Sequence, residues 1–341
     1  MRRQPVLVAA TLSVLVLAGC GTPGSSGGAT SAPAPSAMST PSSSSGVALA
    51  ACQPVAGNQL VVLADDKHLQ TVDNVVPAVN AAAATASPAL LGVLDAVSAT
   101  LDTPKLIALN KAVDVDRTTS TQAAAQYVSD QKLGTQQQVG GGKKVLVGAA
   151  NFSESATLAE IYAAVLRAAG FAATTQTIGN RETYEPALER GDLTVVPEYA
   201  GTLTEFINKK VNGANATPLA SPDLGATTTA LKGLGSKVGL TFGTPAAAQD
   251  QNAFAVTTAF AQAHKLSTLS DLAAACGGVT LGGPPECPTR PFCQPGLTGT
   301  YGIDVTDFVS LDAGGPLTKA ALQQGKVAIG LVFSSDGSLA G

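Results

Sequence analysis

Residues 144–171 read KVLVGAANFSESATLAEIYAAVLRAAGF, and this stretch decides the fold class. Its first seven residues form an apolar run that is typical of a buried strand. Ser153 can cap the helix that follows, in which apolar residues recur at helical spacing from Leu158 onward. Gly170 then ends the helix. A buried strand followed by an amphipathic helix is the repeating unit of an α/β protein.

Strands and helices continue to alternate toward the C-terminus, whereas the pattern toward the N-terminus is mainly helical. After residue 171, the expected strands include LTVVPEY, NAFAVTT, VTLGGPPE, DFVSLD and VAIGLVF, with helices between them. This pattern predicts an α/β fold with parallel sheets. Before residue 144, it predicts one strand, NQLVVLADD at 58–66, followed only by helices. Because that strand has no partner near it in sequence, we expect it to pair with a distant segment.

The N-terminus carries the features of an export signal. Two arginines precede an apolar run that ends in Leu-Ala-Gly-Cys at residues 17–20. This ending resembles a lipoprotein processing site, at which Cys20 would be lipidated; an ordinary secretory signal is the alternative. Residues 21–51 are rich in Gly, Ser, Pro and Ala and predict a flexible linker. We therefore expect an exported lipoprotein, anchored to the cell membrane on its extracytoplasmic face.

The length of the chain favours a two-lobed body, and its charge argues against a nucleic-acid-binding protein. The body after the linker is long enough for two lobes rather than one core. The formal net charge is -4, and charged residues make up only 13% of the 341 residues. No basic patch stands out in the sequence, so nucleic acid is not an expected partner.

The cysteine content predicts disulfides. Five cysteines are present, and four remain in the body if Cys20 carries lipid. An exported chain favours disulfides over free thiols. We predict one bridge between Cys287 and Cys293, around the loop CPTRPFC, which leaves Cys52 for Cys276. A zinc site is the alternative, but neither histidine stands at ligand spacing from a cysteine pair, so we expect no metal.

Several motifs together resemble one family. NFSESATLAEIYAAVLRAAGF and RETYEPALERGDLTVVPEYAGT resemble the substrate-binding lipoproteins of osmoprotectant ABC importers, which collect glycine betaine, choline or carnitine. TRPFCQPGLTGTYGID and VFSSDGSL resemble segments of the family's second lobe. The resemblance implies a periplasmic-binding-protein type II fold, with two α/β lobes that close on a hinge.

The order of the motifs implies a circular permutation of that family. The segment LVVLADDKHLQTVDNVVPAV resembles the part that follows VFSTDG in the family, yet here it stands near the N-terminus. A gene-model artefact is the alternative explanation. The expected division is 1–20 signal peptide, 21–51 linker, 52–133 permuted C-terminal segment (hinge strand and first-lobe helices), 134–143 second linker, 144–246 first lobe and 247–341 second lobe.

The matching motif positions imply a ligand site. In the family, aromatic rings surround a trimethylammonium group, while hydroxyl and basic groups hold a carboxylate. Tyr199 in PEYAGT matches a cage tyrosine, and Thr202 matches the hydroxyl that meets the carboxylate. Arg290 in TRPFCQPGL matches an arginine with the same role, although it could equally hold only the carbonyl groups of its own loop.

Other site positions depart from the family. Phe254 stands in place of a tyrosine, and a core position is an equal alternative for it. Asn252 stands at a polar or acidic position, and Ser155 replaces a glutamine in the NFSES motif that begins with Asn151. The aromatic cage is thus only partly retained, and a solute with a carboxylate or several hydroxyls fits as well.

The expected function is solute binding without catalysis or a cofactor. The expected partners are a small-molecule ligand and the permease and ATPase subunits of an ABC importer. A surface sensor or scaffold with the same fold is one alternative. A serine hydrolase is the other, but NFSES is not the G-x-S-x-G motif that such enzymes carry.

Overall fold

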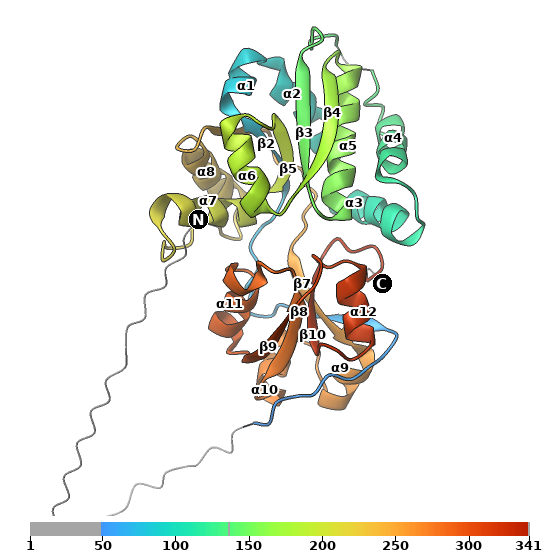
Figure 1. The fold of residues 1–341 in the computed structure, drawn as a ribbon, viewed down its shortest axis with the longest axis vertical. Helices are drawn as coiled ribbons and strands as arrows, with labels where there is room; N and C mark the ends of the chain where they lie inside the picture. Colours follow the sequence, from blue (N-terminus) through green and yellow to red (C-terminus); the bar gives the residue numbers. More distant parts are fainter. Residues whose placement is uncertain (1–48, 136, 340–341) are drawn as a thin grey trace, which may run out of the picture. The chain divides into compact units, whose positions relative to one another are not determined.

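The computed structural model describes residues 49–135 and 137–339, which form two sheets with helices around them (Figure 1). The predicted signal peptide, Cys20 and residues 21–48 of the predicted linker lie outside the described residues, as do positions 136, 340 and 341. In the part of the chain that is described, no helix has the length and apolar character needed to cross a membrane.

The first lobe is built on a five-stranded sheet with the strand order β4-β3-β5-β2-β6. Strand β3 runs parallel to β4 and β5, whereas β2 runs antiparallel to β5 and β6. The strands are β2 (Val75–Asn80), β3 (Lys144–Ala150), β4 (Ala172–Gly179), β5 (Val195–Tyr199) and β6 (Leu240–Phe242).

Strand β2 corrects the expectation that only helices follow the first strand. All of its residues are buried. Val75 and Val79 belong to the core on one face of the sheet, while Val76 and Ala78 belong to the core on the other. A strand with helices over both faces reads as a continuous apolar run, and a run this short is not distinguished from a buried helical segment by its pattern.

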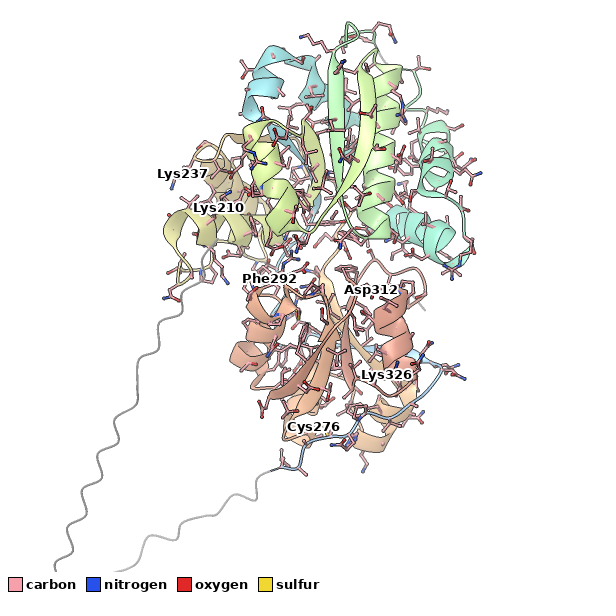
Figure 2. The ribbon with its side chains drawn as sticks, viewed as in Figure 1. Lys210, Lys237, Cys276, Phe292, Asp312 and Lys326 are labelled. Atoms are coloured by element: carbon pink, nitrogen blue, oxygen red, sulfur yellow. A yellow bond between two sulfur atoms is a disulfide. The ribbon has the colours of Figure 1, made fainter. Side chains whose placement is uncertain are left out.

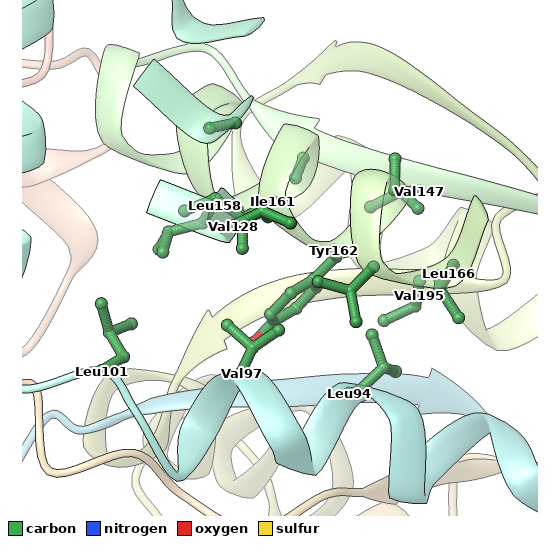
Figure 3. Close-up of a cluster of buried hydrophobic side chains, with 14 of the residues drawn as sticks. Leu94, Val97, Leu101, Val128, Val147, Leu158, Ile161, Tyr162, Leu166 and Val195 are labelled. Atoms are coloured by element: carbon green, nitrogen blue, oxygen red, sulfur yellow. The ribbon is translucent and has the colours of Figure 1, made fainter. Parts of the chain in front are cut away.

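Helices cover both faces of this sheet. Helix α5 supplies Tyr162, which packs among Leu94, Val97 and Leu158 (Figure 3). The helices of the first lobe are α1 (Ala81–Ala86), α2 (Ala89–Ser98), α3 (Thr103–Asn110), the π-helical turn η1 (Lys111–Val115), α4 (Ser120–Asp130), α5 (Ser153–Ala168), α6 (Arg181–Arg190), α7 (Ala200–Asn212) and α8 (Leu224–Gly235).

The second lobe is built on a sheet with the strand order β1-β7-β10-β8-β9. Its first strand pairs with β7, a segment almost 200 positions away, which confirms the predicted distant partner. This strand therefore lies in the second lobe, whereas the expected division put residues 52–133 with the first. The strands are β1 (Leu60–Leu63), β7 (Asn252–Thr257), β8 (Val279–Gly283), β9 (Val305–Ser310) and β10 (Ile329–Phe333).

Both sheets are mixed, so the expectation of parallel sheets is wrong in part. In the second sheet β10, β8 and β9 run parallel, but β7 runs antiparallel to both of its neighbours. Apolar clusters cover its two faces. The helices here are α9 (Thr258–His264), α10 (Leu269–Ala275), the 3-10 turn η2 (Cys287–Thr289), α11 (Gln294–Gly296), the π-helical turn η3 (Leu297–Tyr301) and α12 (Pro316–Gln323).

Two segments, 64–74 and 243–251, connect the sheets, and we call them the hinge segments. They are bonded to each other: Asn74 forms an antiparallel bridge with Gln249, and the Asp250 N–H donates to the Asp73 carbonyl at 3.1 Å. The residues after β10 join them, because the Ser334 N–H donates to the Gln251 carbonyl at 2.9 Å. Three separate stretches of sequence thus meet where the lobes join.

The ends of the body lie in the same sheet. Strands β1 and β10 flank β7 on its two sides, and Leu60 and Leu339 pack against the same apolar cluster. The two strands are not direct neighbours, because β7 lies between them.

Both predicted disulfides are confirmed. Cys52 is bonded to Cys276, which is labelled in Figure 2, and Cys287 is bonded to Cys293. His264 lies near the first bridge in space, since its Nδ1 atom is 3.6 Å from Cys52 Sγ. Sequence spacing could not show this proximity, because 212 positions separate the two residues.

Candidate functional site

A cavity of about 490 Å³ lies between the two lobes. It is lined by residues of the first lobe, by residues of the second lobe and by Asp73 and Asp250 of the hinge segments. Lys210 and Phe292, both labelled in Figure 2, line it from the first and second lobes respectively. This is the volume range of pockets that hold small molecules.

Five of the predicted site residues line this cavity. Thr202 lies in the first turn of α7, where its N–H donates to Asp73 Oδ1 at 3.0 Å. The Asn252 side chain donates to the Phe292 carbonyl at 3.0 Å and so holds the disulfide-closed loop. The five are Asn151, Tyr199, Thr202, Asn252 and Arg290.

Phe254 and Ser155 do not line the cavity. Phe254 lies two residues farther into β7 than Asn252, and its ring is buried in the core of the second lobe. Ser155 is buried at the start of α5, where its hydroxyl oxygen accepts the Ala150 N–H at 2.8 Å. Both side chains thus stabilise the fold behind the site.

An aromatic row lines the cavity, and the sequence motifs revealed only one of its members. The Phe152 ring lies 6.2 Å from the Tyr199 ring and 5.4 Å from the Phe333 ring, between centroids. Phe152 follows β3 and Phe333 ends β10, so the row combines both lobes. Their position at the carboxyl ends of strands, where α/β sheets bind ligands, was the available signal. We call these three residues the aromatic row.

A buried ion pair supports the first-lobe wall. Arg181 donates from Nε and Nη2 to both carboxylate oxygens of Glu198, at 2.8 and 2.7 Å. The Tyr184 hydroxyl also donates to Glu198, at 2.6 Å, and Arg181 donates a further bond to Thr202. Because Glu198 directly precedes Tyr199, this network sets the position of the first ring in the aromatic row.

Arg290 links the lobes rather than standing free in the cavity. Its guanidinium group pairs with Glu182 of the first lobe at 2.8 Å and with Glu286 of its own lobe at 3.3 Å. The side-chain hydrogen bonds found for Arg290 go to Glu182, not to the carbonyl groups of its loop. The predicted carboxylate-binding arginine is thus already neutralised by two protein carboxylates.

Three buried carboxyl groups gather where the lobes join. Tyr199 donates to Glu154 at 2.6 Å, and Ser335 donates from its hydroxyl to Glu154 at 2.6 Å and from its N–H to Asp250 at 3.2 Å. Burial raises the pKa of Asp73 to about 7. Burial, and then the charge of Glu154, raises the pKa of Asp250 well above its ordinary value.

The chain was compared with protein families, with curated proteins and with solved structures. The sequence profile of the substrate-binding domain of ABC-type glycine betaine transport systems matches residues 53–130 and 143–341. A solved structure of apo YehZ from Escherichia coli is 27% identical; the match covers 58% of this chain and 72% of that one, with a TM-score of 0.37. A search of curated proteins found no significant match.

The family match spans well over half of the chain and includes both lobes and the cavity. The two mixed sheets with their helices are consistent with the type II periplasmic-binding fold. Proteins of this family are extracytoplasmic, bind a solute for an ABC importer and are not enzymes. The chain belongs to the family of substrate-binding domains of ABC-type glycine betaine transport systems.

Proposed function

We propose that the cavity binds a small solute with a quaternary ammonium group, such as glycine betaine, choline or carnitine, for delivery to an ABC permease and its ATPase. The observation that carries this proposal is the aromatic row of Tyr199, Phe152 and Phe333 on the cavity wall. Aromatic faces attract a quaternary ammonium group, and each contact contributes about 0.5–2 kcal/mol.

The arrangement of the row suits a protein that closes around its solute. Tyr199 and Phe152 belong to the first lobe and Phe333 to the second, so a cation held by all three rings would draw the lobes together. The Arg290–Glu182 ion pair already connects the lobes at the same cavity. Both features support closure by rotation at the hinge segments.

Two further features of the chain are a proposed membrane anchor and the order of its segments. We propose that Cys20 is lipidated and that residues 21–51 tether the lobes to the membrane, on the strength of the LAGC ending. We also propose that the body is a circular permutation of its family. Support comes from the break in the family match at residues 131–142, within which most of the predicted second linker falls, and from the position of β1 and β10 beside β7.

Replacing Phe152 by alanine should weaken the affinity for the solute by about 2- to 30-fold, because one cation–π contact of 0.5–2 kcal/mol is lost. The measurement is the ligand-induced rise in melting temperature across a concentration series of glycine betaine, choline and carnitine. The dissociation constant of each solute follows from the same series.

Phe308→Ala is the matched control, since Phe308 is a half-buried ring on β9 that does not line the cavity. It should leave the affinity unchanged. The proposed function is wrong if none of the three solutes shifts the melting temperature of the unsubstituted protein.

A further inference from the structure

We infer that Asp250 is a ligand-binding residue, and that the cavity takes a small organic cation without a carboxylate, which enters in exchange for a proton. This inference rests on the proposed function and names the chemical subclass of the solute. Neither the sequence motifs nor the family resemblance pointed to Asp250.

The charges around the cavity leave little to hold a ligand carboxylate. Arg181 is paired with Glu198, and Arg290 with Glu182 and Glu286. Lys210 is paired with Glu185 and Glu189. A ligand carboxylate would have to displace one of these protein carboxylates, at the expense of an existing ion pair.

Lys209 is the lining cation for which no ion pair is found among the described residues. It lies on the last turn of α7, seven residues after Thr202, which is about 10 Å along the helix axis. A single methylene separates the carboxylate of glycine betaine from its nitrogen. To meet that carboxylate with the head group at the aromatic row, the Lys209 side chain would have to turn back along α7 toward Thr202.

Among the acidic groups at the cavity, by contrast, Asp250 has no basic partner among the described residues. Asp250 lines the cavity, is only 4% exposed and accepts the Ser335 N–H, yet no described basic side chain forms an ion pair with it. The titratable groups that act on it electrostatically include Glu154 of α5, Asp73 of the other hinge segment and the Tyr199 phenol, none of which is basic. The missing positive charge is the one a cationic ligand would supply.

Asp73 differs from Asp250 in its bonding. Its Oδ1 accepts the N–H groups of Gly201 at 2.8 Å and Thr202 at 3.0 Å, so it holds the first turn of α7. Arg181 also acts on it and favours its ionised form. Asp73 therefore has a structural role, and Asp250 is the better candidate for contact with the ligand.

The burial of Asp250 with two other carboxyl groups is the reason to expect that a cation binds in exchange for a proton. Three carboxyl groups lie together out of water, and burial raises the pKa of Glu154 and of Asp250 above its ordinary value, which favours the protonated form of each. A cation at the cavity wall stabilises the ionised carboxylate. The O–H bond of the carboxyl group then breaks, and the proton passes to the solvent as the cation binds.

The test compares choline with glycine betaine, which share the trimethylammonium head and differ in the tail. Calorimetric titration in two buffers of different ionisation enthalpy counts the protons released. Choline should bind at least about tenfold more tightly than glycine betaine and release up to one proton, and its affinity should rise about tenfold per pH unit where the cluster is protonated.

Asp250→Asn removes one titrating group of the cluster and keeps its shape. It should lower the affinity for choline at least about tenfold and reduce the dependence on pH, to which Glu154 and Asp73 still contribute. Its melting temperature without ligand at pH 8 should equal or exceed that of the unsubstituted protein, since a buried carboxyl group with a raised pKa destabilises the fold once it is ionised. Asp304→Asn, an exposed position on the second lobe, is the matched control and should change neither property.

Three outcomes would overturn the inference while the proposed function stands: tighter binding of glycine betaine, choline binding without proton release, or unchanged choline affinity in Asp250→Asn. The first two use the unsubstituted protein, so they decide the matter even if the variant fails to fold. If no quaternary ammonium solute binds at all, the proposed function fails and this inference fails with it.

Discussion

Replacing Glu198 by alanine should lower the free energy of unfolding of the first lobe by about 3–5 kcal/mol. Glu198 is 1% exposed, and its loss leaves the Arg181 guanidinium buried without its carboxylate. The Tyr184 hydroxyl and the Tyr199 N–H lose their acceptor in the same step. Equilibrium unfolding in urea, followed by circular dichroism, measures the change.

Asp192→Ala provides the comparison, because Asp192 also pairs with an arginine, Arg190, at 2.8 Å. Both side chains of that pair are more than 60% exposed, so its loss should cost less than about 1 kcal/mol. The account of the buried network would be contradicted if the two variants lost the same stability.

Removing the disulfide between Cys52 and Cys276 by a double substitution to serine should cost about 2–5 kcal/mol. The bridge closes a loop of 224 positions and thereby restricts the unfolded chain. It also holds the segment before β1, whose backbone is bonded to the loop between α10 and β8 through Ala50–Gly277 and Cys52–Gly278. Thermal and urea unfolding of the oxidised proteins give the loss.

The double serine variant of Cys287 and Cys293 is the control, since that bridge closes a loop of only 6 positions. Its effect on stability should be smaller, because less loop entropy is involved. Its effect on solute binding should be larger, because the loop carries Arg290 and Phe292 into the cavity. A greater stability loss in this control would argue against the role assigned to the long-range bridge.

Many of the helices and strands could be predicted, because the apolar periodicity and capping residues of each segment agree with its place in the folded protein. The strand and helix at 144–170 have the expected bounds to within a few residues, and helices do lie between positions 89 and 130, where helices alone were expected. Strand β2 was not predicted, because a short apolar run such as Val75–Val79 cannot be distinguished from a buried helical segment by periodicity alone. The structure places Pro77 opposite Pro197 of β5 in the antiparallel register.

The candidate site could be predicted only where a residue follows a recognisable motif. Tyr199, Thr202 and Arg290 were identified in this way, and all three line the cavity. Phe333 follows no such motif, and its position at the end of a strand was its one signal. Asp250 had no signal in the sequence, because its role depends on two lobes meeting across a hinge. Phe254 matched a motif position of the ligand site, yet its ring packs into the core of the second lobe.

A crystal structure of the protein with a bound quaternary ammonium solute tests the central claim most directly. The account predicts that the trimethylammonium group lies between the lobes, within about 6 Å of the ring centroids of Tyr199, Phe152 and Phe333. A solute bound away from these rings, or outside the cavity, would contradict it.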